Sequence, residues 1–156
     1  MANDAPPVNL PVNLPVNLEK ELRRKLHPQV LALREAMHRR LLEIIDLPAI
    51  RPEDVEDARF RMYIDKMVDE LLDDYSDRIP STITRAEIKK DFLSETLGLG
   101  ALEELLADDT VSEIMVIDRQ TVYVERKGRL EQVPVGFGSD GALRSIIERI
   151  IMPLGR

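Results

Sequence analysis

The residues whose spacing most resembles a chemical site are three glycines, Gly136, Gly138 and Gly141, which spell Gly-x-Gly-x-x-Gly. They follow a predicted strand and precede a predicted helix, a setting in which backbone amides approach a pyrophosphate at a helix N-terminus. The wider pattern disfavours that chemistry, because the strand belongs to a predicted antiparallel sheet and no parallel strand follows the helix. We therefore expect a flexible connection here, and binding of a nicotinamide or flavin dinucleotide is kept as an alternative.

A second group of chemically capable side chains is acidic. Asp69 and Asp73 lie one turn apart on a predicted helix, with Asp74 and Asp77 close by. Calcium takes about six to eight oxygen ligands, usually from a shaped loop, so a solvated acidic face is favoured over a metal site. The chain has no Cys, and its two His residues are too far apart for an i,i+4 metal pair on a helix. We assign no catalytic residue and no metal ligand.

Phosphate chemistry is also not encoded by these residues alone. A phosphate-binding loop requires Gly-x-x-x-x-Gly-Lys-Ser/Thr, so that backbone amides wrap the phosphates and the Lys reaches them. None of the seven glycines begins such a run. The chain by itself is therefore expected to be inactive as an ATPase of that class.

The composition limits the remaining function classes. The chain has 156 residues, of which 44% are hydrophobic and 33% charged, and its formal net charge is −7. This favours one globular domain or two small ones, and the negative charge disfavours a nucleic-acid partner. The absence of Cys fits a reducing compartment, and no apolar run approaches the roughly 20 residues that cross a bilayer. We expect a cytoplasmic protein whose membrane association, if any, is peripheral.

Apolar residues at three- and four-residue spacing predict three helices, which form a helical bundle over residues 19–97. The first helix, 19–47, is expected to break near His27 because Pro28 follows it, and Asn17 is expected to cap its first piece. The second and third helices are predicted over the ranges 52–76 and 84–97.

The two longer predicted helices differ in charge. Residues 19–40 carry an excess of Lys and Arg, whereas residues 52–78 carry an excess of Asp and Glu. We expect these two helices to pack antiparallel with complementary faces. Docking of the basic helix on anionic lipid or on an acidic partner is the alternative.

After Gly98 and Gly100 the pattern changes from helix to strand. Short β-branched runs joined by links too short for a parallel crossover predict a three-stranded antiparallel meander over residues 113–135. A helix over 140–152 follows, and its apolar face is expected to cover the meander through Leu143, Ile146, Ile147 and Ile150. The predicted fold class is α+β: an amino-terminal three-helix bundle, then a small antiparallel three-stranded sheet covered by a helix.

The amino terminus contains a threefold Pro-Val-Asn-Leu repeat over residues 7–18. A proline at every fourth position blocks helix formation, so residues 1–18 are predicted to be a disordered tail. A docking peptide that uses Asn9, Asn13 and the neighbouring Val and Leu side chains is the alternative.

The carboxy-terminal part of the chain, from Leu97 to Arg156, resembles the type II/type IV secretion ATPase superfamily. Within that superfamily it looks most like the CpaF ATPases of Tad (Flp) pilus assembly. The resemblance lies in four segments, which are LGLGALE at 97–103, LADDTVSEIMV at 106–116, VYVERKGRL at 122–130, and IERI with PLGR between 147 and 156. The sequence departs from the family at Gly136 and Gly138, where charged residues are usual.

This resemblance implies that residues 101–156 form the α/β amino-terminal domain of a hexameric ATPase. The RecA-like motor domain, with its ATP and Mg sites, would then follow Arg156, and this part alone would bind neither. The implied partners are that motor domain, neighbouring subunits of a homo-hexamer and inner-membrane platform proteins, which places the protein on the cytoplasmic side of a bacterial inner membrane.

Two arginines are the site residues that the resemblance implies. Arg149 and Arg156 would lie nearest the motor domain and could contact phosphate across the cleft. Surface or interdomain salt bridging is the alternative for both. The expected function is regulation and assembly of a secretion or pilus ATPase, relaying its motion to the platform proteins, and the alternative is a stand-alone protein-interaction adaptor.

Overall fold

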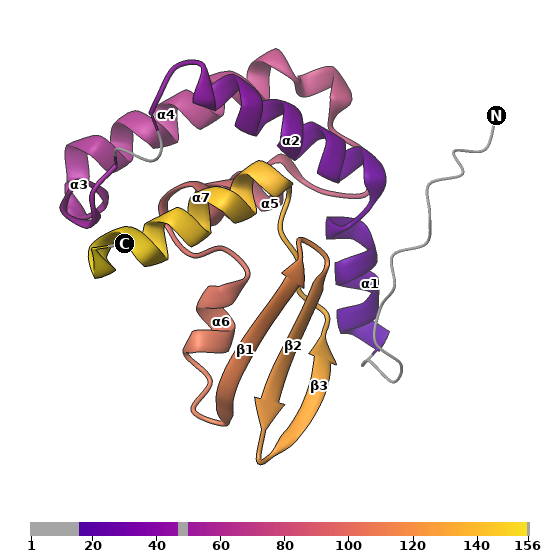
Figure 1. The fold of residues 1–156 in the computed structure, drawn as a ribbon. Helices are drawn as coiled ribbons and strands as arrows, with labels where there is room; N and C mark the ends of the chain where they lie inside the picture. Colours follow the sequence, from indigo (N-terminus) through magenta and orange to yellow (C-terminus); the bar gives the residue numbers. More distant parts are fainter. Residues whose placement is uncertain (1–15, 47–49, 156) are drawn as a thin grey trace.

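The computed structural model describes residues 16–46 and 50–155, which form a mixed helical and sheet fold (Figure 1). This confirms the predicted α+β class. The helices are α1 (Val16–Lys25), α2 (Pro28–Leu42), α3 (Pro52–Glu56), α4 (Ala58–Asp74), α5 (Arg85–Leu97), α6 (Leu102–Leu106) and α7 (Asp140–Ile151). The strands are β1 (Val111–Asp118), β2 (Thr121–Arg126) and β3 (Arg129–Val133), and short 3-10 turns span Ser76–Arg78 and Met152–Leu154.

The start of α1 differs from the sequence prediction. Residues 16–18, assigned to the tail, belong to the helix, and Asn17 lies inside it rather than capping it. The rest of the predicted tail, with Asn9 and Asn13, lies outside the described residues.

Two helix breaks have local causes. The predicted break at His27 is confirmed: Pro28 occupies the first turn of α2, and His27 is extended and accepts a hydrogen bond from the Gln29 amide. The single helix predicted over 52–76 is wrong, because the chain is extended at Asp57 between α3 and α4. The Asp57 carboxylate accepts hydrogen bonds from two amides at the start of α4, so it begins a new helix there.

The helices α2, α4 and α5 share one hydrophobic core. Val30, Leu33, Met37 and Leu41 of α2 meet the apolar stripe of α4 and the side chains of Ile88 and Phe92 from α5, as their spacing predicted. The helix α5 begins at the predicted capping box, in which Thr84 and Glu87 bind each other's backbone amides.

The predicted charge pairing between the basic and acidic helices is not made by direct ion pairs, because α5 supplies ion-pair partners to both. Arg24 and Lys25 of α1 lie 3.3 Å from the carboxylates of Glu87 and Asp91. On the acidic side, Lys89 of α5 lies 2.9 Å from Asp65 of α4. Among the described residues no ion pair joins 19–40 to 52–78 directly.

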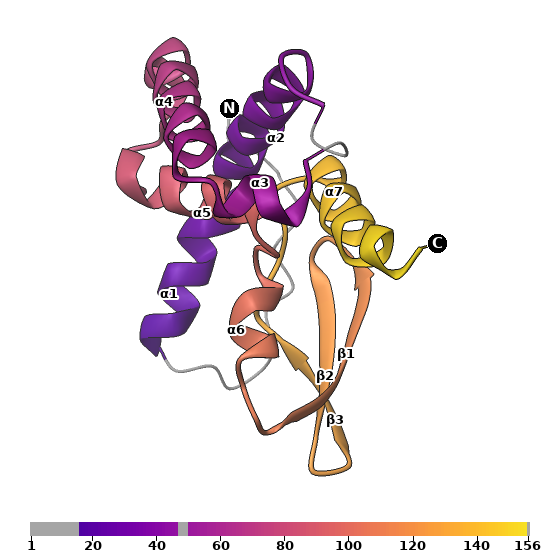
Figure 2. The same cartoon turned by 90° about the vertical axis from the view of Figure 1, so that its left-hand side faces the viewer.

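The meander is confirmed, with strand order β1-β2-β3 and antiparallel pairing throughout. The β2–β3 turn places Lys127 and Gly128 in the left-handed region, at φ 51° and 74°, which suits a two-residue hairpin. One face of the sheet packs into a second hydrophobic core with Leu102 and Leu105 of α6. The helix α6 contacts β1 and lies beside it in Figure 1, and Figure 2 shows the sheet below the layer of α2, α4 and α5.

The helix α7 does not bury the whole face that the sequence predicted. Ile146 is fully buried in the sheet core and Leu143 packs against it, but Ile147 and Ile150 are 46% and 41% exposed. The helix runs between the sheet and the helical layer, where it contacts α2 and α5 (Figure 1). The side chains of Ala142, Ser145 and Arg149 therefore face the interior beside Ile146. The spacing of apolar residues in α7 did not predict this face, because two of its members are polar.

No helix in the described parts of the chain combines the length and the apolar character needed to cross a bilayer.

Candidate functional site

A buried polar junction joins the helical layer to the sheet layer. It forms where α2, the carboxyl end of α5, the β3–α7 connection and α7 meet. Six polar side chains are almost fully buried in this structure, namely Arg34, His38, Glu95, Thr96, Ser139 and Ser145. Buried polar groups are costly unless they are paired, so their hydrogen bonds decide how the two layers fit together.

The centre of the junction is an ion pair between Arg34 of α2 and Glu95 of α5. Arg34 Nη2 lies 2.6 Å from Glu95 Oε1, and both side chains are about 95% buried (6% and 5% exposed). The Gly138 amide, from the β3–α7 connection, donates to the same oxygen at 2.6 Å. Burial raises the pKa of the Glu95 carboxyl, whereas Arg34 and the Gly138 amide favour its charged form. One carboxylate thus holds three separate segments of the chain.

The three glycines of the Gly-x-Gly-x-x-Gly pattern are positions of close packing. A Cβ atom on Gly138 would lie 2.7 Å from Arg34 Nε, and one on Gly141 would lie 3.0 Å from the His38 ring. On Gly136 it would lie 3.0 Å from the Arg119 carbonyl oxygen. The helical bundle therefore occupies the side of this loop at which a phosphate would have to approach, and the dinucleotide alternative is disfavoured.

The start of α7 is also satisfied from within the chain. Ser139 caps the helix, accepting a hydrogen bond from the Ala142 amide at 2.9 Å. Because the Gly138 amide is bound to Glu95, neither of these donors is turned toward a ligand. The loop fixes the direction of α7 and shows no feature of an anion site.

His38 lies next to the central ion pair, one helical turn after Arg34 on α2. Its ring packs against Gly141, and within the described chain neither His38 Nε2 nor Arg34 Nε has a hydrogen-bond partner. Burial lowers the pKa of His38, and the positive charge of Arg149 lowers it further. Both effects favour the neutral form of the His38 ring.

This arrangement predicts a pH-dependent loss of stability. Because the pKa of His38 is lower in the folded state than its ordinary value of 6.5, protons bind the unfolded chain preferentially. The contribution of neutral His38 to the free energy of unfolding is complete above pH 6.5 and is lost as the pH falls from 6.5 through the pKa of the folded state. The free energy of unfolding then changes by at most about 1.4 kcal/mol per pH unit. Urea denaturation of the wild type and of His38→Gln at several pH values measures this difference.

The pH dependence of His38→Gln has to be subtracted from that of the wild type, because Glu95 also contributes. Its raised pKa makes the free energy of unfolding change with pH in the opposite direction in the acidic range. If wild type and His38→Gln show the same pH dependence between 5 and 7, the assignment to His38 is wrong.

Arg149, one of the two predicted site residues, closes the junction from α7. Its Nη2 donates to the Thr96 carbonyl oxygen at 2.6 Å, and its Nη1 donates to the carbonyl oxygen of Gly98. These carbonyls end α5, where a positive charge also meets the negative end of the helix dipole. A phosphate contact by Arg149 would require it to leave these partners, so that role stays a prediction. Arg156 lies outside the described residues.

Removing the Arg149 guanidinium should destabilise the contact between α7 and the end of α5. We expect Arg149→Met to lower the free energy of unfolding by about 1–3 kcal/mol, because two partly buried carbonyl groups at the end of α5 lose their charged donor. The same change should raise the pKa of His38, because the nearby positive charge is gone. Arg144→Met is the matched control, since Arg144 lies exposed on the same helix. Equal effects of the two substitutions, measured by urea denaturation, would contradict the role of Arg149.

The junction residues other than Arg149 were missed at the sequence level. A signal was present for two of them. Arg34 follows Val30 by four residues and Glu95 follows Phe92 by three, so both occupy positions on buried helix faces where an apolar residue is expected. No sequence rule indicates that the two charges meet, because Arg34 and Glu95 lie on helices that are far apart in the chain, Pro28–Leu42 and Arg85–Leu97.

The acidic face of α4 is also engaged. Asp73 lies 2.5 Å from Arg85, and Asp69 lies 2.8 Å from Lys89. Over the described ranges no group of three or more potential ligands could hold a metal ion. These aspartates thus serve to pack α4 on α5.

Comparison with known proteins does not add a relationship. Neither a scan against protein-family models nor a search of curated proteins gave a match to this chain.

Proposed function

We propose that this chain is the amino-terminal regulatory and assembly domain of a hexameric ATPase that powers type II/IV secretion or Tad (Flp) pilus assembly. The observation that carries the proposal is the buried junction, because it fixes the helical bundle to the sheet module through charged and polar contacts. A domain that relays motion between a motor and its partners must move as one body. The Arg34–Glu95–Gly138 contact and the Arg149 closure supply this rigidity.

The exposed end of α7 supports an assembly role. Its last turns and the 3-10 turn after it leave large apolar side chains in solvent, namely Ile147, Ile150, Ile151, Met152 and Leu154. Apolar groups gathered in this way on a surface often mark a contact with another domain or subunit. In the proposed ATPase this surface would meet the motor domain, and ATP and Mg would bind to the motor rather than to the residues described above.

In the same proposal, the partners are the chain's own motor domain, neighbouring subunits of a homo-hexamer and inner-membrane platform proteins. The protein would work at the cytoplasmic side of the bacterial inner membrane. Arg149 and Arg156 would be the arginines nearest the nucleotide.

Two measurements test this function. The reading frame after Arg156 should encode a Gly-x-x-x-x-Gly-Lys-Ser/Thr motif, and the protein that includes it should hydrolyse ATP, whereas residues 1–156 alone should not. Native mass spectrometry of the longer protein should give a hexamer. A stop codon directly after Arg156 would overturn the proposal and favour the stand-alone adaptor, and ATP hydrolysis by residues 1–156 would contradict the division of roles.

A further inference from the structure

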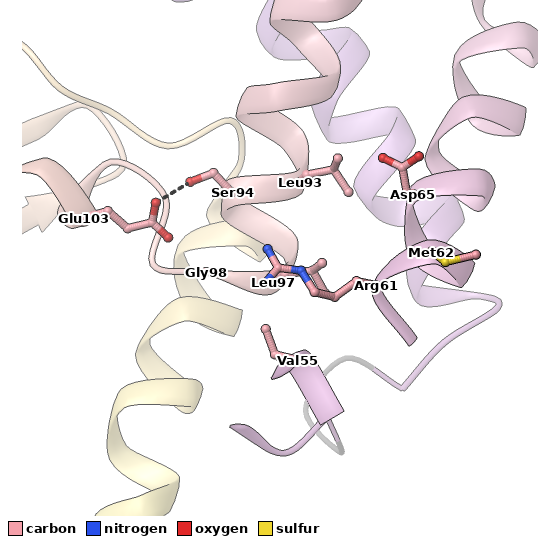
Figure 3. Close-up of a pocket in the computed structure, with 9 residues that line it drawn as sticks. All are labelled: Val55, Arg61, Met62, Asp65, Leu93, Ser94, Leu97, Gly98 and Glu103. Atoms are coloured by element: carbon pink, nitrogen blue, oxygen red, sulfur yellow. Dashed lines mark hydrogen bonds between the residues drawn. The ribbon is translucent and has the colours of Figure 1, made fainter. Parts of the chain in front are cut away.

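A surface hollow lies on the side of the helical layer, between α3, α4 and the carboxyl end of α5. It has a volume of about 610 Å³. Its lining residues are Val55, Arg61, Met62, Asp65, Leu93, Ser94, Leu97, Gly98 and Glu103, drawn in Figure 3. Four of these side chains, Val55, Met62, Leu93 and Leu97, are apolar and come from all three helices, and they share the lining with charged and polar groups.

Two of the three charged side chains in the hollow already have hydrogen-bond partners. Asp65 accepts from Lys89 at 2.9 Å. Glu103 accepts from the Ser94 hydroxyl at 3.1 Å and from the Leu99 amide at 3.0 Å. Arg61, by contrast, forms no side-chain hydrogen bond or ion pair with the described residues, and its guanidinium extends across the hollow toward Leu97 in Figure 3. The hollow therefore combines four apolar side chains with a guanidinium that has no partner within the described part of the chain.

We propose that this hollow binds a short apolar peptide segment of a partner protein, with one carboxylate that pairs with Arg61. The aliphatic lining suits a Leu or Ile side chain, and a guanidinium binds a carboxylate through two parallel hydrogen bonds. Glu103 lies at the other end of the hollow from Arg61 in Figure 3, and both its oxygens accept hydrogen bonds, so an acidic group is favoured only at the Arg61 end. The site is independent of the proposed ATPase function, because it needs only these residues.

The hollow also adjoins the buried junction. Gly98 lines it, and the carbonyl oxygen of Gly98 is the acceptor for Arg149 of α7. A Cβ atom on Gly98 would lie 1.9 Å from Glu103 Oε1, so the backbone is closely fitted at this point. A peptide bound in the hollow would therefore contact the backbone at Gly98, which is hydrogen-bonded to Arg149 of the junction.

Nuclear magnetic resonance titration tests the proposal on the whole 156-residue chain. The probe is N-acetyl-leucyl-glutamyl-leucinamide, and the matched peptide with glutamine in place of glutamate is its control. We expect saturable shifts of the backbone amides from Leu93 to Gly98 and from Val55 to Asp65. The glutamine peptide should bind about threefold more weakly or worse, as loss of one partly exposed ion pair implies.

The protein variants separate the site from general charge attraction. Arg61→Gln should weaken binding of the glutamate peptide by the same factor and should leave binding of the glutamine peptide unchanged. Arg59→Gln, a change on the same helix outside the hollow, should have no effect on either. The proposal is overturned if no amide of the hollow shifts at about 1 mM peptide, or if Arg59→Gln weakens binding as much as Arg61→Gln.

Discussion

Replacing Glu95 with Ala is expected to lower the free energy of unfolding by about 3–5 kcal/mol, a large part of the stability of a domain of this size. The substitution leaves the Arg34 guanidinium buried without its partner and removes the acceptor of the Gly138 amide. Both groups would lose their hydrogen bonds in a place that water does not reach. Equilibrium urea denaturation followed by circular dichroism measures the change.

The control for Glu95→Ala is a carboxylate in an exposed ion pair. Asp73 pairs with Arg85 at 2.5 Å, but its side chain is 72% exposed. We expect Asp73→Ala to cost about 0–1 kcal/mol, because solvent screens the pair. If the two substitutions have similar effects, the Arg34–Glu95 pair does not hold the layers together.

A double variant keeps the prediction testable should Glu95→Ala fail to fold. In Arg34→Met/Glu95→Leu the buried charges are removed together, and the apolar side chains are close to them in size. Replacing both partners of a buried pair by apolar groups is often neutral or stabilising, so the double variant should recover much of the lost stability. A double variant as unstable as Glu95→Ala would indicate that the Gly138 amide, which stays unpaired in both, carries most of the effect.

Replacing Phe137 with Ala is the second large effect, expected to cost about 3–5 kcal/mol. Phe137 lies between two glycines of the Gly-x-Gly-x-x-Gly pattern, and it is fully buried in the sheet core with Val122, Val124 and Ile146. Its amide donates to the Arg119 carbonyl oxygen at 2.7 Å, which fixes the ring over the sheet. Truncation would leave a cavity that this fixed backbone closes only in part. Thermal and urea denaturation measure the loss.

The matched control for Phe137→Ala is Leu130→Ala on β3. Leu130 is 58% exposed, so its truncation should change the free energy of unfolding by less than about 0.5 kcal/mol. A cost below about 1 kcal/mol for Phe137→Ala would contradict the interpretation of this segment as a packing element. The same result would reopen the question of a ligand loop at these glycines.

Several elements were predictable because their causes are local. The capping box at Thr84, the break at His27 before Pro28, and the order of the meander follow from rules that act over a few residues. The split at Asp57 was also local, since an Asp before the first turn is a strong N-cap, but the prediction placed Asp57 within the first part of the helix that begins at Pro52.

The orientation of α7 could not be predicted in this way. Its strongest apolar face, with Ile147 and Ile150, is partly exposed, because the helix lies between two layers and presents Arg149 and Ser145 to one of them. The spacing of apolar residues identifies the most apolar face of a helix, which is usually the buried one. In α7 another face is buried, because the carbonyl groups at the end of α5 bind Arg149.

The pattern of residue types was enough to predict the α+β class, the position of most helices and strands, and the lack of a phosphate-binding loop in these residues. The meeting of Arg34, Glu95, His38 and Arg149 in one junction around the loop that contains Gly138 became visible only in the folded chain. The difference lies in how far apart along the chain the interacting residues are. Caps, breaks and periodicity depend on neighbours a few residues away, whereas a buried charge is stable only beside a partner that the fold brings from a distant part of the chain.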